Sequence, residues 1–184
     1  MAAVGRGRGL ITGRFGHPDD MVPEGIQDVA PWRDWPAAAD GVLHFLHEHV
    51  GWDLWMVTRV EGEHQIVLAS YPEGIVRPGA RLPWAESFCR AMVEGTAPRI
   101  ATVTAAVPEY ACRMTGPGKD VAAYIGVPLV HPDPELFGTV CGVSSRAKPL
   151  SATRDLPVVE MTARLLSTLL AAGMDPPPIP PPPG

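Results

Sequence analysis

The chain has 184 residues, of which 46% are hydrophobic and 19% charged, and its formal net charge is −5. This length suits one well-filled hydrophobic core, and the composition is that of a globular protein rather than a disordered one. The negative charge argues against binding to nucleic acid or to an anionic membrane surface, since both need basic surface. No apolar run in the sequence approaches the roughly 20 residues of a membrane-spanning helix. We therefore expect one cytoplasmic domain, with no nucleic-acid or membrane partner.

Both ends of the chain differ in composition from the middle. Residues 1–33 mix glycine, arginine, proline and acidic residues without the periodicity of a helix or a strand, which predicts a flexible arm. Residues 173–184 contain the run PPPIPPPPG and are predicted to form a stiff polyproline II tail. The domain is thus expected to occupy residues 34–172.

A first helix is predicted between Asp34 and Gly51. Asp34 is a suitable N-cap, Pro36 suits the first turn, and Gly51 suits the left-handed residue that ends a helix. Apolar residues recur at helical spacing between these ends and predict one buried face. This face carries Ala38, Val42, Phe45, Leu46, and His49 or Val50.

The same helix carries a histidine cluster. His44 and His47 are spaced to meet on one helical face, as metal ligands do. The H-E-x-x-H spacing is absent, however, and the sequence offers no evident third or fourth ligand. We therefore expect a solvated helix face and no metal site.

The next segments predict a β-hairpin followed by shorter elements. Apolar residues alternate over residues 53–60 and 65–71, on either side of the turn EGEH. The segment WAESFCRAMVEG, residues 84–95, predicts a short amphipathic helix with Ala85, Phe88, Cys89 and Met92 on one side. Residues 98–104 predict a strand, and residues 106–114 predict a helical turn or a structured loop.

Two further strands are predicted at residues 121–130, VAAYIGVPLV, and 136–145, LFGTVCGVSS. Both are apolar at successive positions, so each is expected to be covered on both faces of its sheet. Pro128 lacks a backbone donor, which predicts an unpaired or bulged position there.

A final helix is predicted from about Ser151, a suitable N-cap, to about Ala172. Its apolar residues recur in steps of three and four, as in helices that pair. This seam is expected to pack on the first helix, on a second copy of the chain, or on both, and it is the predicted dimer interface. The seam consists of Leu156, Val159, Ala163, Leu166 and Leu170.

The three cysteines, Cys89, Cys112 and Cys141, are far apart and form no C-x-x-C pair. A zinc site or a dithiol centre is therefore not indicated, and reduced thiols are expected. Cys89 and Cys141 stand among apolar residues and are interpreted as ordinary packed thiols.

The order of these elements, together with three motifs, resembles a GAF domain, the small-molecule sensor module of signalling proteins. The motifs are LPWAESFCRAMVEGTAPRIATV, AYIGVPLV and LFGTVCGVSS. The pattern W-x-E-S-F-C-x-x-M most resembles actinobacterial GAF domains that precede diguanylate cyclase modules. The resemblance extends over about residues 35–172 and implies an α+β fold. In that fold an antiparallel central sheet has the terminal helices on one face and a pocket, roofed by loops and short helices, on the other.

The resemblance also implies where a ligand would bind. Candidates on the roof segments or the central strand are aromatic residues and cysteines, because tyrosine and tryptophan present a polar group beside an apolar ring. They are Trp84, Cys89, Tyr110, Cys112 and Tyr124. Phe88 is interpreted as core. No catalytic residue, metal ligand or cofactor is predicted.

The function implied is a stand-alone sensory or protein-interaction module of bacterial signalling, without catalysis. We expect it to bind an unidentified small molecule, to form a homodimer and to signal to a separate output protein. The alternative is a cysteine-dependent free methionine sulfoxide reductase of the GAF fold, because Cys89 stands near the position of a cysteine in those enzymes. Their acidic ligand-binding residues are not recognisable here. A third hypothesis is an adaptor whose polyproline tail recruits a partner.

Overall fold

The computed structural model describes residues 29–179 and residue 181. The predicted arm lies mostly outside the described residues, as does the end of the predicted tail. Trp32 begins the compact unit to which all the elements below belong.

The described residues build a six-stranded antiparallel sheet with the order β3-β2-β1-β6-β5-β4. The predicted hairpin forms β1 and β2, and the two apolar strands β5 and β6 lie beside them near the middle of the sheet. The strands are β1 Leu54–Glu61, β2 His64–Tyr71, β3 Arg81–Pro83, β4 Ile100–Ala101, β5 Ala123–Val130 and β6 Leu136–Ser144.

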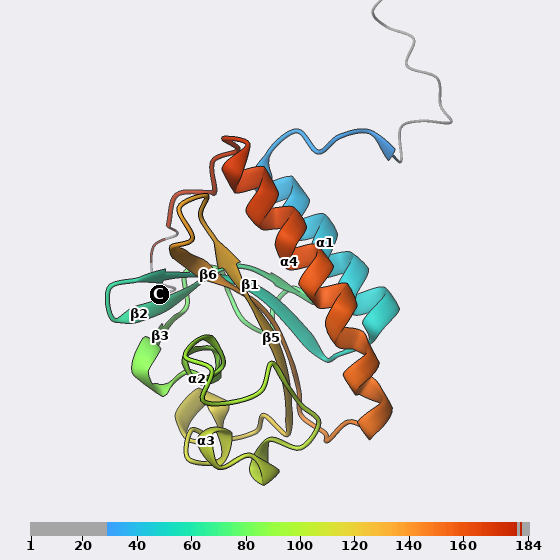
Figure 1. Cartoon of the computed structure of the whole chain (residues 1–184), viewed down its shortest axis with the longest axis vertical. Coiled ribbons are helices and arrows are strands. Elements are labelled where there is room, and N and C mark those ends of the chain that lie inside the picture. Colours follow the sequence, from blue (N-terminus) through green and yellow to red (C-terminus); the bar gives the residue numbers. More distant parts are fainter. Residues whose placement is uncertain (1–28, 180, 182–184) are drawn as a thin grey trace, which may run out of the picture. The chain divides into compact units, whose positions relative to one another are not determined.

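Helices cover both faces of this sheet, as Figure 1 shows. The two long helices lie side by side on one face, and the short ones lie on the other. The long helices are α1 Trp35–Val50 and α4 Leu156–Ala171. The short helices are η3 Trp84–Glu86, α2 Phe88–Val93, η4 Thr104–Ala106, α3 Pro108–Ala111 and η5 Gly116–Gly118, and η6 Leu150–Asp155 leads into α4. The α+β architecture predicted from the sequence is confirmed.

The core is divided between the two faces by the alternation of side chains along each strand. On β5, Ile125 belongs to the cluster under α1 and α4, whereas its neighbour Tyr124 belongs to the cluster under α2 and α3. On β6, Val140 and Cys141 divide in the same way. The prediction that both strands are covered on both faces is therefore confirmed.

The ends of α1 are set by the residues that the sequence indicated. Asp34 Oδ1 accepts a hydrogen bond from Ala37 N at 2.8 Å, and Gly51 takes the left-handed conformation with φ 74°. The buried face differs from the prediction, because Leu43 is buried whereas Phe45 is 41% exposed. The periodicity thus located the helix correctly but placed its apolar face slightly off its true orientation.

Two other helices begin and end at residues that differ from the prediction. The segment 84–95 divides into η3 and α2, with Ser87 capping α2 by accepting a hydrogen bond from Arg90 N at 3.1 Å. Ser151 lies within η6 rather than at a helix cap, and α4 begins at Leu156.

The apolar seam of α4 packs inside the protomer. Val159, Ala163 and Leu166 are at most 1% exposed and belong to the cluster between the sheet, α1 and α4. Leu156 and Leu170 are partly buried against the same cluster. This corrects the predicted dimer interface for Val159, Ala163 and Leu166, because side chains that are already covered by their own sheet and helix leave no surface for a second copy.

Pro128 fits the sheet because its nitrogen faces a side without a partner strand. Gly126 N donates to Arg99 O at 2.8 Å, toward the β4 side, and residues two apart in a strand direct their backbone donors the same way. β4 is only two residues long and ends before it reaches Pro128. The predicted unpaired position is thus confirmed on that side, whereas the register toward β6 stays regular at Pro128 and shifts after Leu129.

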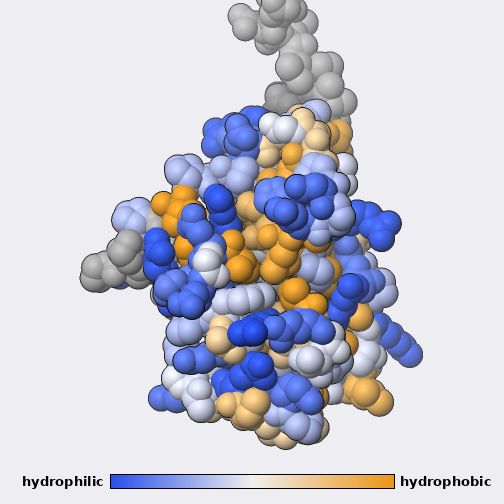
Figure 2. Space-filling model, turned by 60° about the vertical axis from the view of Figure 1, so that its left-hand side comes forward, coloured by the Kyte–Doolittle hydropathy of each residue, from blue (hydrophilic) through white to orange (hydrophobic). Residues whose placement is uncertain are grey.

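Polar and charged residues interrupt the apolar surface. On the face shown in Figure 2, hydrophobic areas lie between hydrophilic ones rather than joining into one continuous area. None of the helices described in residues 29–179 has the length and apolar character that a membrane crossing requires.

Candidate functional site

A cavity of about 320 Å³ lies between the sheet and the roof formed by α2 and residues 113–121. Its volume is within the range of small-molecule sites in proteins. Strands β1, β2, β3, β5 and β6 supply the floor and walls, and most of the lining side chains are apolar. The polar and sulfur-bearing residues of the lining include Thr58, Gln65, Cys89, Arg113, Tyr124 and Cys141. The cavity lies where the resemblance implied a pocket.

A buried polar network crosses the floor of this cavity. Gln65 Nε2 donates to Thr58 Oγ1 at 2.9 Å and to Thr139 Oγ1 at 3.2 Å, and the two threonine hydroxyls are 2.8 Å apart. All three residues are buried, so each polar group depends on the others for its hydrogen bonds. These residues were missed in the sequence, although polar side chains at inward positions of apolar strands were a signal that could have found them.

Cys89, on the first turn of α2, faces this network from the roof. Its sulfur accepts hydrogen bonds from Tyr124 Oη and from Thr139 Oγ1, both at 3.3 Å. A hydrogen bond from Cys141 lowers the pKa of the Cys89 thiol to about 6, with further lowering by Thr139, Tyr124 and Gln65, although burial acts in the opposite direction. The same bond raises the pKa of Cys141 well above its ordinary value, because the shared proton stays on Cys141.

Arg113 brings a cationic group to the roof of the cavity. One guanidinium nitrogen, Nη1, donates to the Glu109 carbonyl at 2.5 Å, which fixes the direction of the side chain. Its Nε is buried and has no hydrogen-bond partner among the described residues. A buried donor without an acceptor is costly, so this nitrogen is suited to an acceptor on a bound molecule.

The predicted ligand-binding residues take three different positions. Cys89 and Tyr124 line the cavity. Tyr110 is fully buried behind Tyr124, with ring centroids 5.1 Å apart, and its hydroxyl donates to the Pro98 carbonyl. Trp84 packs at the edge of the same apolar cluster, and Cys112 is exposed; neither lines the cavity. The structure therefore brings Cys89, Tyr124 and Tyr110 together and leaves Trp84 and Cys112 outside.

The histidines of α1 are held by packing. The rings of His44 and His47 contact the ring of Tyr71 edge-on, with centroids 4.8 and 5.0 Å away, and His47 Nδ1 lies 3.1 Å from the Trp52 carbonyl oxygen. Within the part of the chain that the structure describes, no three His, Cys, Asp or Glu residues are grouped to hold a metal ion.

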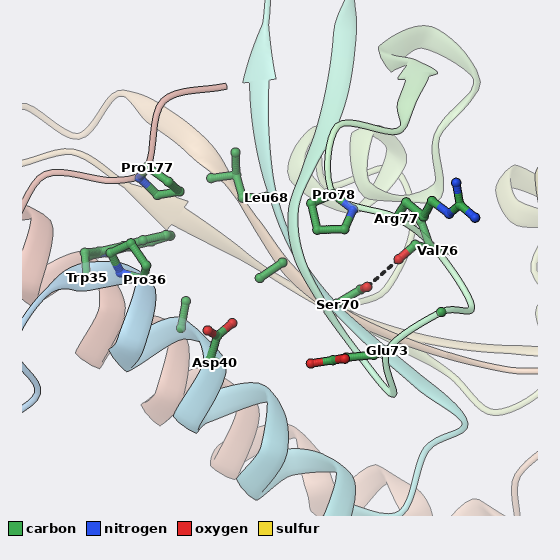
Figure 3. A pocket seen from close by; sticks show the side chains of 13 residues that line it. Trp35, Pro36, Asp40, Leu68, Ser70, Glu73, Val76, Arg77, Pro78 and Pro177 are labelled. Atoms are coloured by element: carbon green, nitrogen blue, oxygen red, sulfur yellow. Dashed lines mark hydrogen bonds between the residues drawn. The ribbon is translucent and has the colours of Figure 1, made fainter. Parts of the chain in front are cut away.

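A second cavity, of about 550 Å³, lies between α1, β2 and the loop that follows β2. Asp40 and Glu73 point toward each other across it, and Pro177 lies near Trp35 (Figure 3). Partial burial, then the charges of Glu73 and Asp34, raise the pKa of Asp40. This cavity lacks the buried network of the first, and we therefore consider the cavity beneath the roof the better candidate site.

No protein-family model matches the sequence, and no curated protein matches it. Similar solved structures do exist. The free methionine-R-sulfoxide reductase of Neisseria meningitidis, solved with its substrate, is 19% identical, with a TM-score of 0.61 over 79% of this chain and 83% of that chain. The GAF domain of a phosphoenolpyruvate-protein phosphotransferase from Coxiella burnetii is 17% identical, with a TM-score of 0.59 over 80% and 90%.

The chromophore-binding domain of the bacteriophytochrome RpBphP3 from R. palustris is 13% identical, with a TM-score of 0.62. That match covers 80% of this chain and spans 58% of the bacteriophytochrome domain. Identities this low establish a likeness of fold alone. The antiparallel sheet with helices on both faces matches these structures in fold, and the chain has the GAF fold that its sequence motifs predict.

Proposed function

We propose that the chain is a GAF-type sensory module that binds a small organic anion in the cavity beneath α2. The observation that carries this proposal is the buried Nε of Arg113, a cationic donor in the cavity wall without an acceptor among the described residues. A carboxylate or similar oxyanion supplies the acceptor that this nitrogen needs. The apolar majority of the lining suits the body of the ligand.

The polar floor supplies a second point of recognition. Gln65 and Thr58 both line the cavity and are held in place by Thr139. Because their hydrogen bonds fix their orientation, a ligand meets a preformed surface and less free energy is lost in ordering it. A ligand with an anionic group at one end and an uncharged polar group at the other matches the positions of Arg113 and Gln65.

The signal would then pass to the helical layer and, in the cytoplasm, to a separate output protein of a bacterial signalling system. A ligand shifts such a system only by binding one arrangement more tightly than another. We propose that the arrangement concerned is a homodimer formed by the outer faces of the long helices. Val158, Met161 and Leu165 recur at helical spacing on α4 and are exposed, and so is Phe45 on α1.

The ligand proposal is tested by a thermal-shift screen of small carboxylates against the full chain. We expect at least one compound to raise the melting temperature, because a ligand at 100 times its Kd stabilises a protein by about 2.7 kcal/mol. Arg113→Gln should lose this response. The matched control is Arg90→Gln, since Arg90 is paired with Glu94 on the outside of α2, and it should keep the response. Equal responses in the two variants, or no response of the wild-type chain, would contradict the proposal.

A second candidate function is the reduction of free methionine sulfoxide. The lowered pKa of Cys89 in the cavity favours it, since a thiolate is the reactive form of cysteine, and two of the similar structures are free methionine-R-sulfoxide reductases. An assay with free methionine-R-sulfoxide and dithiothreitol distinguishes the two functions. Turnover that is lost in Cys89→Ser and kept in Cys112→Ser would favour the reductase over the sensor.

A further inference from the structure

Two cysteines on different elements meet at the candidate site. Cys89 lies on α2 in the roof, and Cys141 lies on β6 in the floor. Both line the same cavity, are only 4% and 2% exposed, and belong to the same buried cluster. Thr139, two residues before Cys141 on the same strand, donates a hydrogen bond to the Cys89 sulfur at 3.3 Å, so both cysteines border the same part of the floor.

Two hydroxyl groups donate hydrogen bonds to the sulfur of Cys89. Tyr124 Oη and Thr139 Oγ1 donate to it, and the hydroxyl of Thr139 is itself held by Thr58 and Gln65. Apolar packing alone needs no such donors around a thiol, whereas a thiolate is stabilised by them. The cavity gives a small reagent access to a sulfur that the outer surface covers.

We propose that Cys89 and Cys141 form a peroxide-reactive dithiol site, in which Cys89 is the attacking thiol and Cys141 the resolving one. The product is a disulfide that links α2 in the roof to β6 in the floor. Cys112 is excluded from this pair because it is exposed and lies outside the cavity lining.

The chemistry balances with a peroxide as the oxidant. The Cys89 thiolate attacks one oxygen of the peroxide, the O–O bond breaks, and the leaving oxygen takes up a proton to become an alcohol or water. Cys89 is then a sulfenic acid. Cys141 attacks its sulfur, the S–O bond breaks, and the thiol proton of Cys141 leaves with the hydroxide as water. Two thiols lose two electrons in total and the peroxide gains them.

The disulfide would change the candidate ligand site, because Cys89 loses its thiolate charge and α2 is tied to the floor. This inference uses the cavity of the proposed function but does not require that a ligand be bound. Oxidation would therefore be a second input to the same module. Ligand binding and dithiol oxidation can therefore be detected by separate experiments, and either one can occur without the other.

The test uses the full chain carrying Cys112→Ser, an exposed substitution that leaves both cavity thiols in place. The protein is treated with hydrogen peroxide, denatured and alkylated, and its intact mass and peptides are measured. We expect the chain to lose the mass of two hydrogen atoms, to resist alkylation at both cysteines, and to yield one peptide pair joined through Cys89 and Cys141. Dithiothreitol should restore both thiols.

A further variant checks the order of the steps. With Cys141→Ser added, no disulfide forms, and dimedone should label Cys89 as the trapped sulfenic acid. Two fully alkylated cysteines after peroxide treatment of the Cys112→Ser chain would overturn the proposal. So would oxidation of Cys89 to the sulfinic acid without a disulfide, because Cys141 would then not resolve it. Either result leaves the carboxylate screen and the Arg113→Gln comparison unaffected.

Discussion

Cys89 is the residue whose chemistry depends most on its neighbours. The titratable and charged groups that line the cavity with it are Cys141 on β6, Tyr124 on β5, Arg81 on β3, Glu86 on η3 and Arg113 in the roof, and Tyr110 on α3 lies behind Tyr124. Burial, and then the charge of Cys89, raises the pKa of both tyrosines, so they act as neutral groups when Cys89 titrates. The pKa of Cys89 is thus set mainly by hydrogen bonds, and its reactivity should follow them.

The pH dependence of Cys89 alkylation tests whether hydrogen bonds set the pKa of this thiol. In the Cys112→Ser chain, we expect the rate with iodoacetamide to rise with a midpoint near pH 6, below the pKa of about 8.5 for an ordinary thiol. Because the pKa of the Cys89 thiol is lower in the folded chain than in the unfolded chain, ionisation of Cys89 stabilises the fold at pH values above the unfolded pKa. This stabilisation is lost as the pH falls through the folded pKa. Thr139→Val removes one donor and should move the midpoint upward. A midpoint at the ordinary value in the parent chain would contradict the hydrogen-bond account.

The position of α4 was predictable from the sequence, but the partner of its apolar seam was not. Its period of apolar residues located the helix and the buried seam, but a period is the same whether the seam packs on the chain's own sheet or on a second copy. The α1 caps Asp34 and Gly51 were predicted because capping is local chemistry. The orientation of α1 was less accurate, because Phe45 and Leu43 are both apolar and only packing decides which is buried.

The residues of the candidate site were also predicted only in part. The motif around Cys89 and the apolar strand around Tyr124 located two of its lining residues. Thr58 and Gln65 were missed because the alternation of the hairpin does not say which inward positions border a cavity. Arg113 was considered only as a sequence neighbour of Cys112, and its burial depends on how the roof folds over the sheet.

Two substitutions on α4 test the corrected view of this helix. Met161, which is 64% exposed, belongs to the stripe proposed for dimerisation, whereas Leu166 is fully buried. Met161→Glu should convert a dimer to a monomer in light scattering and leave the melting temperature of the monomer nearly unchanged. Leu166→Ala should lower the free energy of unfolding by about 2–5 kcal/mol because it leaves a cavity in the core. A dimer that persists in Met161→Glu would remove this stripe from the proposed interface.

For the molecule as a whole, the sheet separates a layer of two long helices from a layer of short helices and loops that contains the candidate cavity. α1 and α4 pack with the sheet in one cluster, and α2 and α3 pack in the other (Figure 1). β5 and β6 contribute side chains to both clusters. A ligand or a disulfide beneath α2 therefore acts on strands whose opposite face contacts the long helices, which is the physical basis for the proposed sensory role.

A ligand site beneath α2 can be located by hydrogen–deuterium exchange of the full chain, measured with and without the carboxylate that raises its melting temperature most. We predict slower exchange in residues 84–93 and 110–121, which form or adjoin the roof of that cavity. Arg113→Gln should abolish this protection. Protection confined to α1 and residues 68–78, which border the other cavity, or no protection at all, would contradict it.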